Sequence, residues 1–174
     1  MYSLNHQLFL ILNADETSPV FLIAIARFLA EWPIGLALII AFFTLASRKT
    51  ERVVVMRLLL TVALAMFTAY AIRKIHYNPR PFVIDLGQAF ISHAATSSFP
   101  SFHGTLLFSM AASLLFSHNE RFPGVLILLL GFITAWARIF LGVHYPLDMF
   151  GALVTAFLSA AIVHWCFLFR RHPA

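Results

Sequence analysis

The sequence predicts an all-α, polytopic membrane helical bundle that forms a single domain over residues 1–174. Hydrophobic residues make up 61% of the chain and charged residues only 11%, whereas about 25% of the residues in an ordinary soluble domain are charged. The mean hydropathy is +0.87. The few charges gather in short clusters between long apolar runs. Apolar runs of about 20 residues between charged clusters are typical of membrane-spanning helices.

The N-terminal part is less regular than the rest. Residues 2–12 are apolar but shorter than the roughly 20 residues that a crossing needs, so we expect an interfacial helix there. Residues 17–32 contain Arg27 and Glu31 and end before Pro33. This pattern favours a short surface or re-entrant helix, followed by a span that begins at Pro33. The alternative is one tilted helix through both parts.

The other expected spans are the apolar runs 53–72, 104–117, 122–137 and 149–169. With a span from Pro33 the chain has five spans, an outside N-terminus and an inside C-terminus. If residues 17–32 also cross, there are six spans and the N-terminus moves inside.

Basic residues in short loops mark the cytoplasmic side. On either count of spans, the cytoplasmic set is Arg48, Lys49, Arg52, Arg57, Arg121, Arg170 and Arg171. Four basic residues fall on the opposite face: Arg73, Lys74, Arg80 and Arg138. These four break the positive-inside trend, so they need another explanation.

That opposite face also collects other polar residues from separate segments: His76, His93, Ser101, His103, His144 and Asp148. Several cations and histidines with few acids fit an anion, above all a phosphate group, because guanidinium and ammonium groups pair with its oxygens. The alternative is a divalent metal held by His144 and Asp148, which are one helical turn apart. The neighbouring cations would repel a metal, so we expect no metal and no cofactor.

Three blocks carry a resemblance to a known family: Arg80-Pro81, Phe99–Thr105 (Phe-Pro-Ser-Phe-His-Gly-Thr) and Arg138-x5-His144-x3-Asp148. In this order they resemble the signature of the type 2 phosphatidic acid phosphatase superfamily, a group of membrane lipid phosphatases. The short chain, its amphipathic N-terminal part and the segment 93–101 look most like the bacterial undecaprenyl-diphosphate phosphatases of this superfamily.

The sequence departs from the family pattern at two positions near the phosphate. Phe102 stands where the family's Pro-Ser-Gly-His motif has a small residue. The pattern places a lysine seven positions before Arg80, which is Arg73 in this chain, while Lys74 is one residue closer. Either residue could supply the cation.

The resemblance and the residue types imply a chemistry. His144 is the expected nucleophile, giving a phosphohistidine that water hydrolyses, and Asp148 would hold the proton of its other ring nitrogen. His103 is the expected general acid. His76 and His93 are expected to have no chemical role, or at most a contact with substrate. The expected phosphate-binding residues are Arg73, Lys74, Arg80, Ser101, Gly104 and Arg138.

The expected function is the hydrolysis of undecaprenyl diphosphate, an isoprenoid diphosphate, on the extracytoplasmic face of the bacterial cytoplasmic membrane, with no nucleic-acid partner. Two alternatives lie within the superfamily: a phosphatase of phosphatidate or phosphatidylglycerophosphate, and a lipid phosphotransferase. The alternative outside enzymes is a small anion transporter. Glu31 could orient polar groups where the lipid enters.

Overall fold

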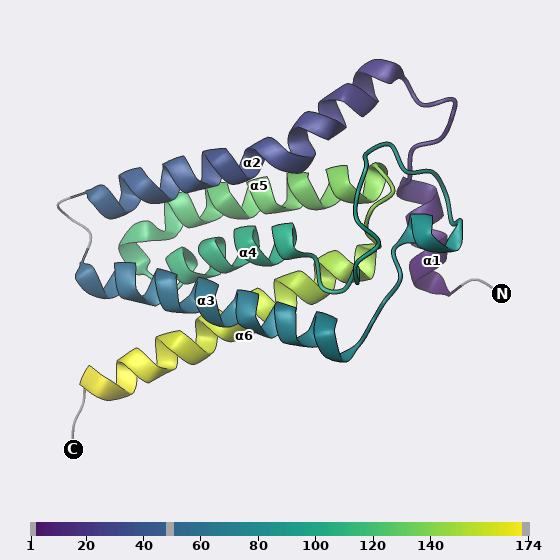
Figure 1. Cartoon of the computed structure of the whole chain (residues 1–174). Helices are drawn as coiled ribbons and strands as arrows, with labels where there is room; N and C mark the ends of the chain where they lie inside the picture. The colour runs from purple at the N-terminus through teal and green to yellow at the C-terminus, as the bar shows by residue number, and fades with distance from the viewer. Residues whose placement is uncertain (1–2, 48–50, 172–174) are drawn as a thin grey trace.

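We describe the computed structural model over residues 3–47 and 51–171. This part of the chain consists of helices, turns and one long loop, without a strand (Figure 1), so the predicted all-α bundle is confirmed. The α-helices are Leu4–Leu12 (α1), Val20–Ala46 (α2), Arg52–Ile75 (α3), Phe102–Leu115 (α4), Arg121–Phe140 (α5) and Pro146–Arg171 (α6). Two short 3-10 helices are Pro81–Ile84 (η1) and His118–Glu120 (η2).

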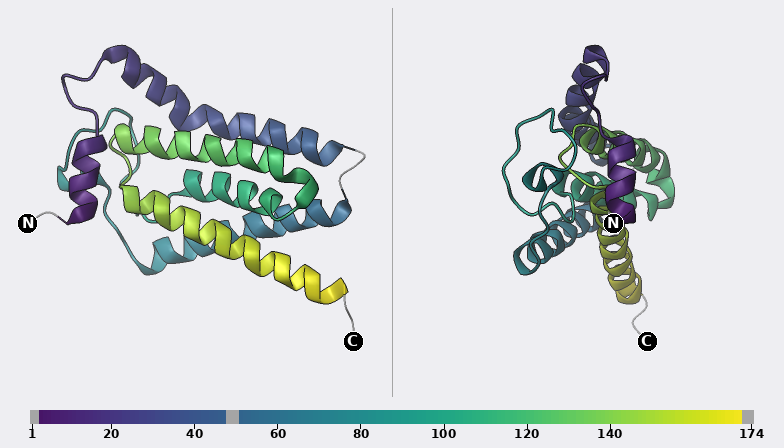
Figure 2. Two further views of the ribbon diagram at one scale, coloured as in Figure 1. Left: turned by 180° about the vertical axis from the view of Figure 1, so that it is seen from behind. Right: turned by 90° about the vertical axis from the view of Figure 1, so that its right-hand side faces the viewer.

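The first helix, α1, lies across one end of the bundle rather than along it (Figures 1 and 2). The Ser3 hydroxyl accepts a hydrogen bond from the His6 N–H and so begins the helix, as side-chain oxygens often do. Phe9 is fully buried against the bundle. The short N-terminal helix predicted from the sequence is therefore confirmed over residues 4–12.

The predicted break at Pro33 is wrong, because α2 is one continuous helix from Val20 to Ala46. Pro33 has no N–H to donate to the carbonyl of Leu29 four residues earlier. The hydroxyl of Thr134 on α5 donates to that carbonyl instead, at 3.3 Å. The alternative of one helix through both parts is confirmed, and the six-span topology is wrong. Near its middle α2 changes direction (Figure 1), as helices do at a proline.

Four helices, α2, α3, α5 and α6, are long and apolar enough to cross a membrane. Their outward faces expose large apolar side chains, among them Phe43, Phe67, Phe150 and Trp165. An apolar surface of this extent is unusual for a soluble monomer and is normal for a surface that faces lipid. The chain is a multi-pass membrane protein.

The fifth apolar helix, α4, lies at the centre, where it packs against α3, α5 and α6. Ten of its 14 residues are buried. Its length is only about 21 Å at 1.5 Å per residue, less than the roughly 30 Å of a hydrocarbon core. In Figure 1 the start of α4 is set back along the bundle from the end of α5 and the start of α6, and the loop before it reaches into the bundle.

This loop, residues 76–101, is held by bonds between its two arms. The Asn78 N–H donates to the Ser97 hydroxyl at 3.1 Å, and the Ser98 N–H donates to the Asn78 carbonyl at 2.8 Å. Since buried backbone polar groups need partners, this pairing allows the loop to enter the bundle.

Asn13, just after α1, ties the loop to the turn between α5 and α6. Its side-chain amide donates to the carbonyls of Gln88 and Phe140, and its side-chain oxygen accepts from the Gln88 N–H. Gly142 in the turn has φ +80°, and a side chain there would collide with the Gln88 carbonyl. The turn requires glycine for both reasons.

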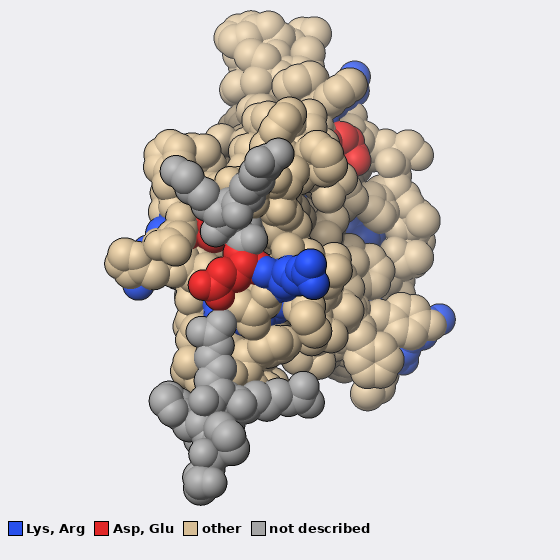
Figure 3. Space-filling view, turned by 90° about the vertical axis from the view of Figure 1, so that its left-hand side faces the viewer, with Lys and Arg blue, Asp and Glu red and all other residues tan. Residues whose placement is uncertain are grey.

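The other end of the bundle carries the beginnings of α3 and α5, and with them Arg52 and Arg121. There the Arg57 guanidinium donates to the Ser117 hydroxyl at 3.0 Å. Figure 3 looks onto this end and shows charged side chains in a few small groups on a largely uncharged surface. The predicted cytoplasmic residues Arg48 and Lys49, and the side chains of Arg170 and Arg171, lie outside the part described.

Candidate active site

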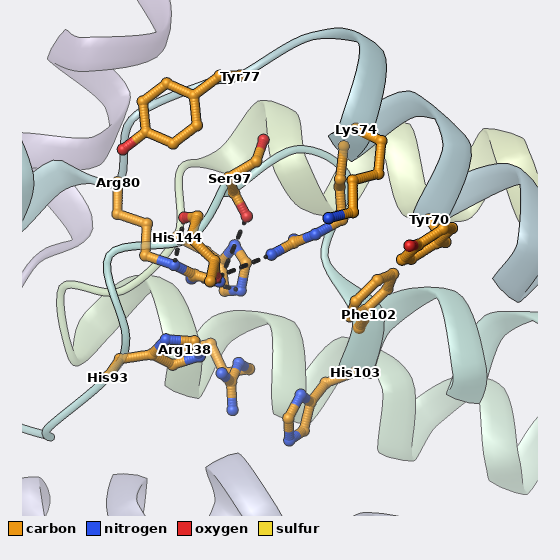
Figure 4. A pocket seen from close by; sticks show the side chains of 12 residues that line it. Tyr70, Lys74, Tyr77, Arg80, His93, Ser97, Phe102, His103, Arg138 and His144 are labelled. Atoms are coloured by element: carbon orange, nitrogen blue, oxygen red, sulfur yellow. Dashed lines mark hydrogen bonds between the residues drawn. The ribbon is translucent and has the colours of Figure 1, made fainter.

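A cavity of about 460 Å³ opens beneath the loop, at the recessed start of α4 (Figure 4). Its lining residues are Tyr70, Arg73, Lys74, Tyr77, Arg80, His93, Thr96, Ser97, Phe102, His103, Arg138 and His144. The lining therefore includes both predicted catalytic histidines and all four predicted cations. The remaining predicted residues, Asp148, Ser101 and Gly104, do not line the cavity.

The imidazole of His144 is almost fully buried, and its surroundings select one tautomer. Nη1 of Arg80 lies 3.1 Å from Nε2 of His144. A guanidinium group can only donate, so Nε2 is the acceptor and Nδ1 carries the proton of the neutral ring. Nδ1 lies 3.1 Å from Oδ2 of Asp148, to which it donates. The lone pair of Nε2 is thus on the side of the ring that Arg80 contacts.

Asp148 lies behind the imidazole in the first turn of α6, and its carboxylate is itself held in place. Oδ2 also accepts from the Tyr145 N–H at 2.8 Å, and Oδ1 accepts from the Ser98 hydroxyl at 3.3 Å. A carboxylate with these partners cannot swing away from His144 without breaking several bonds. It therefore orients the ring from outside the cavity.

The His144 ring is neutral at neutral pH. Burial lowers the pKa of His144 well below its ordinary value of 6.5, and the nearby charges of Arg80 and Arg138 lower this pKa further. A neutral imidazole with a free lone pair is the form that can act as a nucleophile.

Arg80 is buried, and its guanidinium helps to hold the loop in place by donating to the carbonyls of Val143 at 2.7 Å and Thr96 at 3.1 Å. Burial, together with the charges of Arg73 and Arg138, lowers the pKa of Arg80 to about 10. The group still stays charged at neutral pH. Mutually repelling guanidinium groups around one cavity favour the binding of an anion between them.

Arg138 is buried at the end of α5, with donors still unused. Its Nη1 donates to Oε1 of Glu31 at 3.0 Å. Its Nε has no hydrogen-bond partner in the part of the chain described. Buried donors without a partner are rare in folded proteins. This one suits an oxygen of a bound anion.

Glu31 joins Arg138 to the second histidine. Its Oε2 lies 3.2 Å from Nε2 of His103, in the first turn of α4. The sequence indicated only that Glu31 could orient polar groups at a lipid entry, and no motif links it to either partner. Its position depends on the continuous course of α2, where the sequence predicted a break at Pro33.

Arg73 and Lys74 occupy different environments. The Arg73 guanidinium donates to the carbonyls of Pro100 at 3.0 Å and Ser98 at 3.3 Å. It also lies 4.3 Å above the centre of the Phe102 ring, within the range of a cation–π contact. Lys74 is exposed, with its Nζ 5.6 Å from the centre of the Tyr70 ring. The two departures from the family pattern, Arg73 and Phe102, are therefore in contact.

Ser101 and Gly104 shape the site from behind. The Ser101 hydroxyl caps α4 by accepting from the Gly104 N–H at 3.3 Å. A side chain at Gly104 would meet Ala152 and Met149 of α6 at 3.1 and 3.3 Å. The glycine therefore allows α4 and α6 to pack closely, and its missing side chain faces α6 rather than the cavity.

Two lining residues of the loop, Thr96 and Ser97, were not predicted from the sequence. Thr96 and Ser97 lie in the polar run before the second motif, and this run was their only signal. His93 also lines the cavity, with its ring centre 6.3 Å from that of His144. Burial lowers the pKa of His93. His76 is exposed and is not among the lining residues.

The geometry also bears on the alternative of a metal between His144 and Asp148. The two side chains are bonded to each other, so they do not converge on a third point. Across residues 3–47 and 51–171, no three histidine, cysteine or acidic side chains are grouped so that they could hold a metal ion.

A family model described as PAP2 superfamily matches residues 54–172, which include all three sequence blocks. YbjG of Escherichia coli K12, whose name designates it provisionally as an undecaprenyl-diphosphatase, is 35% identical over 92% of this chain and 83% of its own length. The undecaprenyl-diphosphatase BcrC of Bacillus subtilis 168 is 31% identical over 89% of this chain and 80% of its own length.

Among solved structures, Aquifex aeolicus LpxE has a similar fold, with a TM-score of 0.76 and 25% identity. The alignment covers 93% of this chain and 95% of LpxE. A Bacillus subtilis PAP2-type phosphatidylglycerolphosphate phosphatase aligns with a TM-score of 0.66 over 94% of this chain and 83% of its own, at 16% identity. That second likeness concerns the fold alone.

Proposed function

This chain belongs to the PAP2 superfamily and is a membrane lipid phosphatase, and on that premise we propose that it converts undecaprenyl diphosphate to undecaprenyl phosphate and inorganic phosphate through a phosphohistidine at His144. One observation carries the chemistry. His144, whose ring is held by Asp148 so that Nε2 keeps its lone pair, lines a cavity together with the guanidinium groups of three arginines. The names of the two relatives support the choice of lipid.

In the first step the terminal phosphate enters between the guanidinium groups of Arg73, Arg80 and Arg138. Arg80 transfers its Nη1 hydrogen bond from His144 to a phosphate oxygen, which frees the Nε2 lone pair. Nε2 then forms a bond to phosphorus while the bond from phosphorus to the bridging oxygen breaks. The electron pair of the broken bond leaves with the lipid phosphate, whose oxygen takes a proton from the charged His103 ring, and Asp148 stabilises the positive His144 ring that forms.

In the second step a water molecule attacks phosphorus from the side that the lipid phosphate has left. His103 in its neutral form accepts a proton from this water as the oxygen bonds to phosphorus. The bond from phosphorus to Nε2 breaks, and its electron pair returns to the His144 ring. Inorganic phosphate leaves, and His103 holds the proton that it can supply to the next leaving group.

The proposed site faces the extracytoplasmic side. The support is the charge pattern: Arg52, Arg57 and Arg121 belong to the opposite end of the bundle, and basic residues near spans favour the cytoplasm. To test this, we would label Glu16→Cys at the site end and Asn119→Cys at the other end in a Cys166→Ser background. The proposal requires that an impermeant thiol reagent outside intact cells modifies only the first.

Substrate choice is tested by phosphate release from the purified protein in detergent with a metal chelator present. We expect undecaprenyl diphosphate to be hydrolysed with a higher kcat/KM than phosphatidate or phosphatidylglycerophosphate. A preference for either glycerophospholipid would replace the proposed substrate with that lipid. Transfer of the phosphate to an added lipid alcohol in place of water would identify a phosphotransferase.

A further inference from the structure

Glu31 is a carboxylate on the membrane-spanning helix α2, and its side chain is 60% exposed. It borders a shallow groove that is otherwise lined by Trp32, Ile34, Gly35 and Leu38. Ionisable groups within membrane spans are costly and are usually paired for a function. Both partners of Glu31 line the cavity of the candidate site. We therefore relate the free-energy cost of placing this carboxylate in a membrane span to the site rather than to the groove.

The turn of α2 before Pro33 fixes where this carboxylate lies. The Leu29 carbonyl, left without its helical donor by Pro33, accepts from Thr134 of α5. One residue later the Ala30 carbonyl accepts from Nη1 of Arg138 at 3.4 Å. These two bonds tie the turn before Pro33 to α5, and the next side chain along, Glu31, meets Arg138 and His103.

The contact with Glu31 also determines the state of the His103 ring. A carboxylate only accepts, so Nε2 of His103 must carry a proton to bond to Oε2. Nδ1 is then the ring nitrogen left for the substrate. Because the ring already has its first proton on Nε2, Nδ1 can donate only when the ring is positively charged.

Burial opposes a positive charge on His103, and three ionisable groups act on the ring from the elements around it: Arg138 on α5, His93 on the loop and Glu31 on α2. Arg138 opposes a positive charge on His103, and so does His93 when it is protonated. Glu31 is the group of the three that favours the charged ring.

We propose that Glu31 is a positioning residue for His103: it holds the ring by Nε2 and stabilises the charged form, so that Nδ1–H can donate its proton to the leaving oxygen. This role rests on the phosphatase mechanism proposed above. As the bond from phosphorus to the bridging oxygen breaks, that oxygen takes the electron pair and the Nδ1 proton. His103 is then neutral and still bonded to Glu31, ready to accept a proton from water.

The need for this proton depends on the leaving group. A lipid phosphate monoester releases an alcohol, whose alkoxide is a poor leaving group. A lipid diphosphate releases a phosphate monoester, which leaves well without a proton. Glu31→Gln keeps the shape of the side chain and removes its charge. We expect it to lower kcat on phosphatidate by about 10²-fold and on undecaprenyl diphosphate by less than about 10-fold.

The pH profile of phosphatidate hydrolysis provides a readout that a structural role would not change. The basic limb is the fall in kcat at high pH, where the His103 ring loses its proton. In Glu31→Gln this limb moves to lower pH, because the ring loses its proton more easily without the charge of Glu31. Glu31→Asp keeps the charge on a shorter side chain and should recover much of the rate and the wild-type basic limb. The matched control is Glu16→Gln, an exposed glutamate at the same end that bonds to Gln88; neither substrate should respond.

Equal losses on both substrates with an unmoved basic limb would overturn the role and leave Glu31 as a support for Arg138. An unchanged rate in Glu31→Gln would overturn it as well. If Glu31→Gln does not fold in detergent, Glu31→Asp decides, since a basic limb moved to lower pH than in the wild type contradicts the role. Failure of the proposed substrate is a separate result, because it appears in the wild type as a lack of diphosphate hydrolysis while the phosphatidate profile still tests Glu31.

Discussion

The two histidines of the site are held in different ways. His144 is almost fully buried, and its partners are Asp148 four residues away and Arg80 in the loop. The side chain of His103 is 26% exposed, and its partner Glu31 is 72 residues away on an outer helix. The first histidine is fixed by its own turn and α6, whereas the second depends on how α2 packs against α4 and α5.

This difference matches the two roles proposed for the histidines, because a nucleophile must be held rigidly whereas a general acid can adjust its position. A nucleophile requires its lone pair in line with the bond that breaks, and small displacements are costly to the rate. A general acid must serve two oxygens in succession, that of the leaving group and that of water, so some freedom suits it. Partial exposure also places His103 nearer to the outside of the bundle than His144.

The largest expected effect is at the rigid histidine. In the proposed mechanism His144→Ala removes the atom that bonds to phosphorus, so phosphate release from undecaprenyl diphosphate should fall by roughly 10⁴-fold or more, the scale for loss of a nucleophile. The acid-labile phosphoprotein trapped from radiolabelled substrate should disappear with it. The control is His118→Ala, an exposed histidine at the other end of the bundle. Near wild-type turnover by His144→Ala would disprove the assignment.

The rigid half of the site is also the half that the sequence predicts well. His144 and Asp148 lie one helical turn apart in a single motif, so their contact follows from spacing and local structure. Arg80 and Arg138 belong to the other motifs. Their convergence on one face follows from the alternation of the spans, even though the first span was placed from Pro33 and α2 begins at Val20.

The adjustable half was predicted less well, because its contacts are made between distant segments. Nothing near Glu31 or Pro33 in the sequence indicates that Thr134 would replace the lost helical donor. Gly104 was expected to admit the phosphate, but its missing side chain faces α6. Motif position indicates that a residue belongs to the site, and packing decides which way it faces.

The next largest effect concerns two adjacent cations that line the cavity, Arg73 and Lys74. Arg73→Ala and Lys74→Ala each remove one positive charge, so a general field effect would make them equal. Because the Arg73 guanidinium is held over Phe102 beside the loop while Lys74 is exposed, we expect a loss in kcat/KM of about 10²-fold for Arg73→Ala and less than about 5-fold for Lys74→Ala.

Arg73→Lys sharpens this test, since it restores the charge without the planar fork that stacks on Phe102. An intermediate rate would show that charge and geometry both contribute. The reverse ranking, with Lys74→Ala the more damaging variant, would assign the phosphate contact to Lys74. Both alanine variants should elute from gel filtration in detergent like the wild type, so that differences in rate report on the site.

The smallest expected effect is in the pH dependence, where the buried histidine should differ from an ordinary one. Protonation of Nε2 would destroy the nucleophile, so activity is lost as pH falls through the pKa of His144. Burial and the charges of Arg80, Arg138, His93 and Arg73 place this pKa well below 6.5, while the Asp148 carboxylate acts in the other direction. We therefore expect kcat/KM for undecaprenyl diphosphate, whose leaving group depends little on His103, to change by no more than about 2-fold as pH falls from 7.5 to 6.5, and to fall at lower pH.

The substrate phosphate also titrates in this range, but its limb should shift between phosphatidate and undecaprenyl diphosphate, whereas a limb that belongs to His144 stays in place. An acid limb centred at or above pH 6.5 with both lipids would show that the nucleophile is solvated, and the contrast between the two histidines would then be lost.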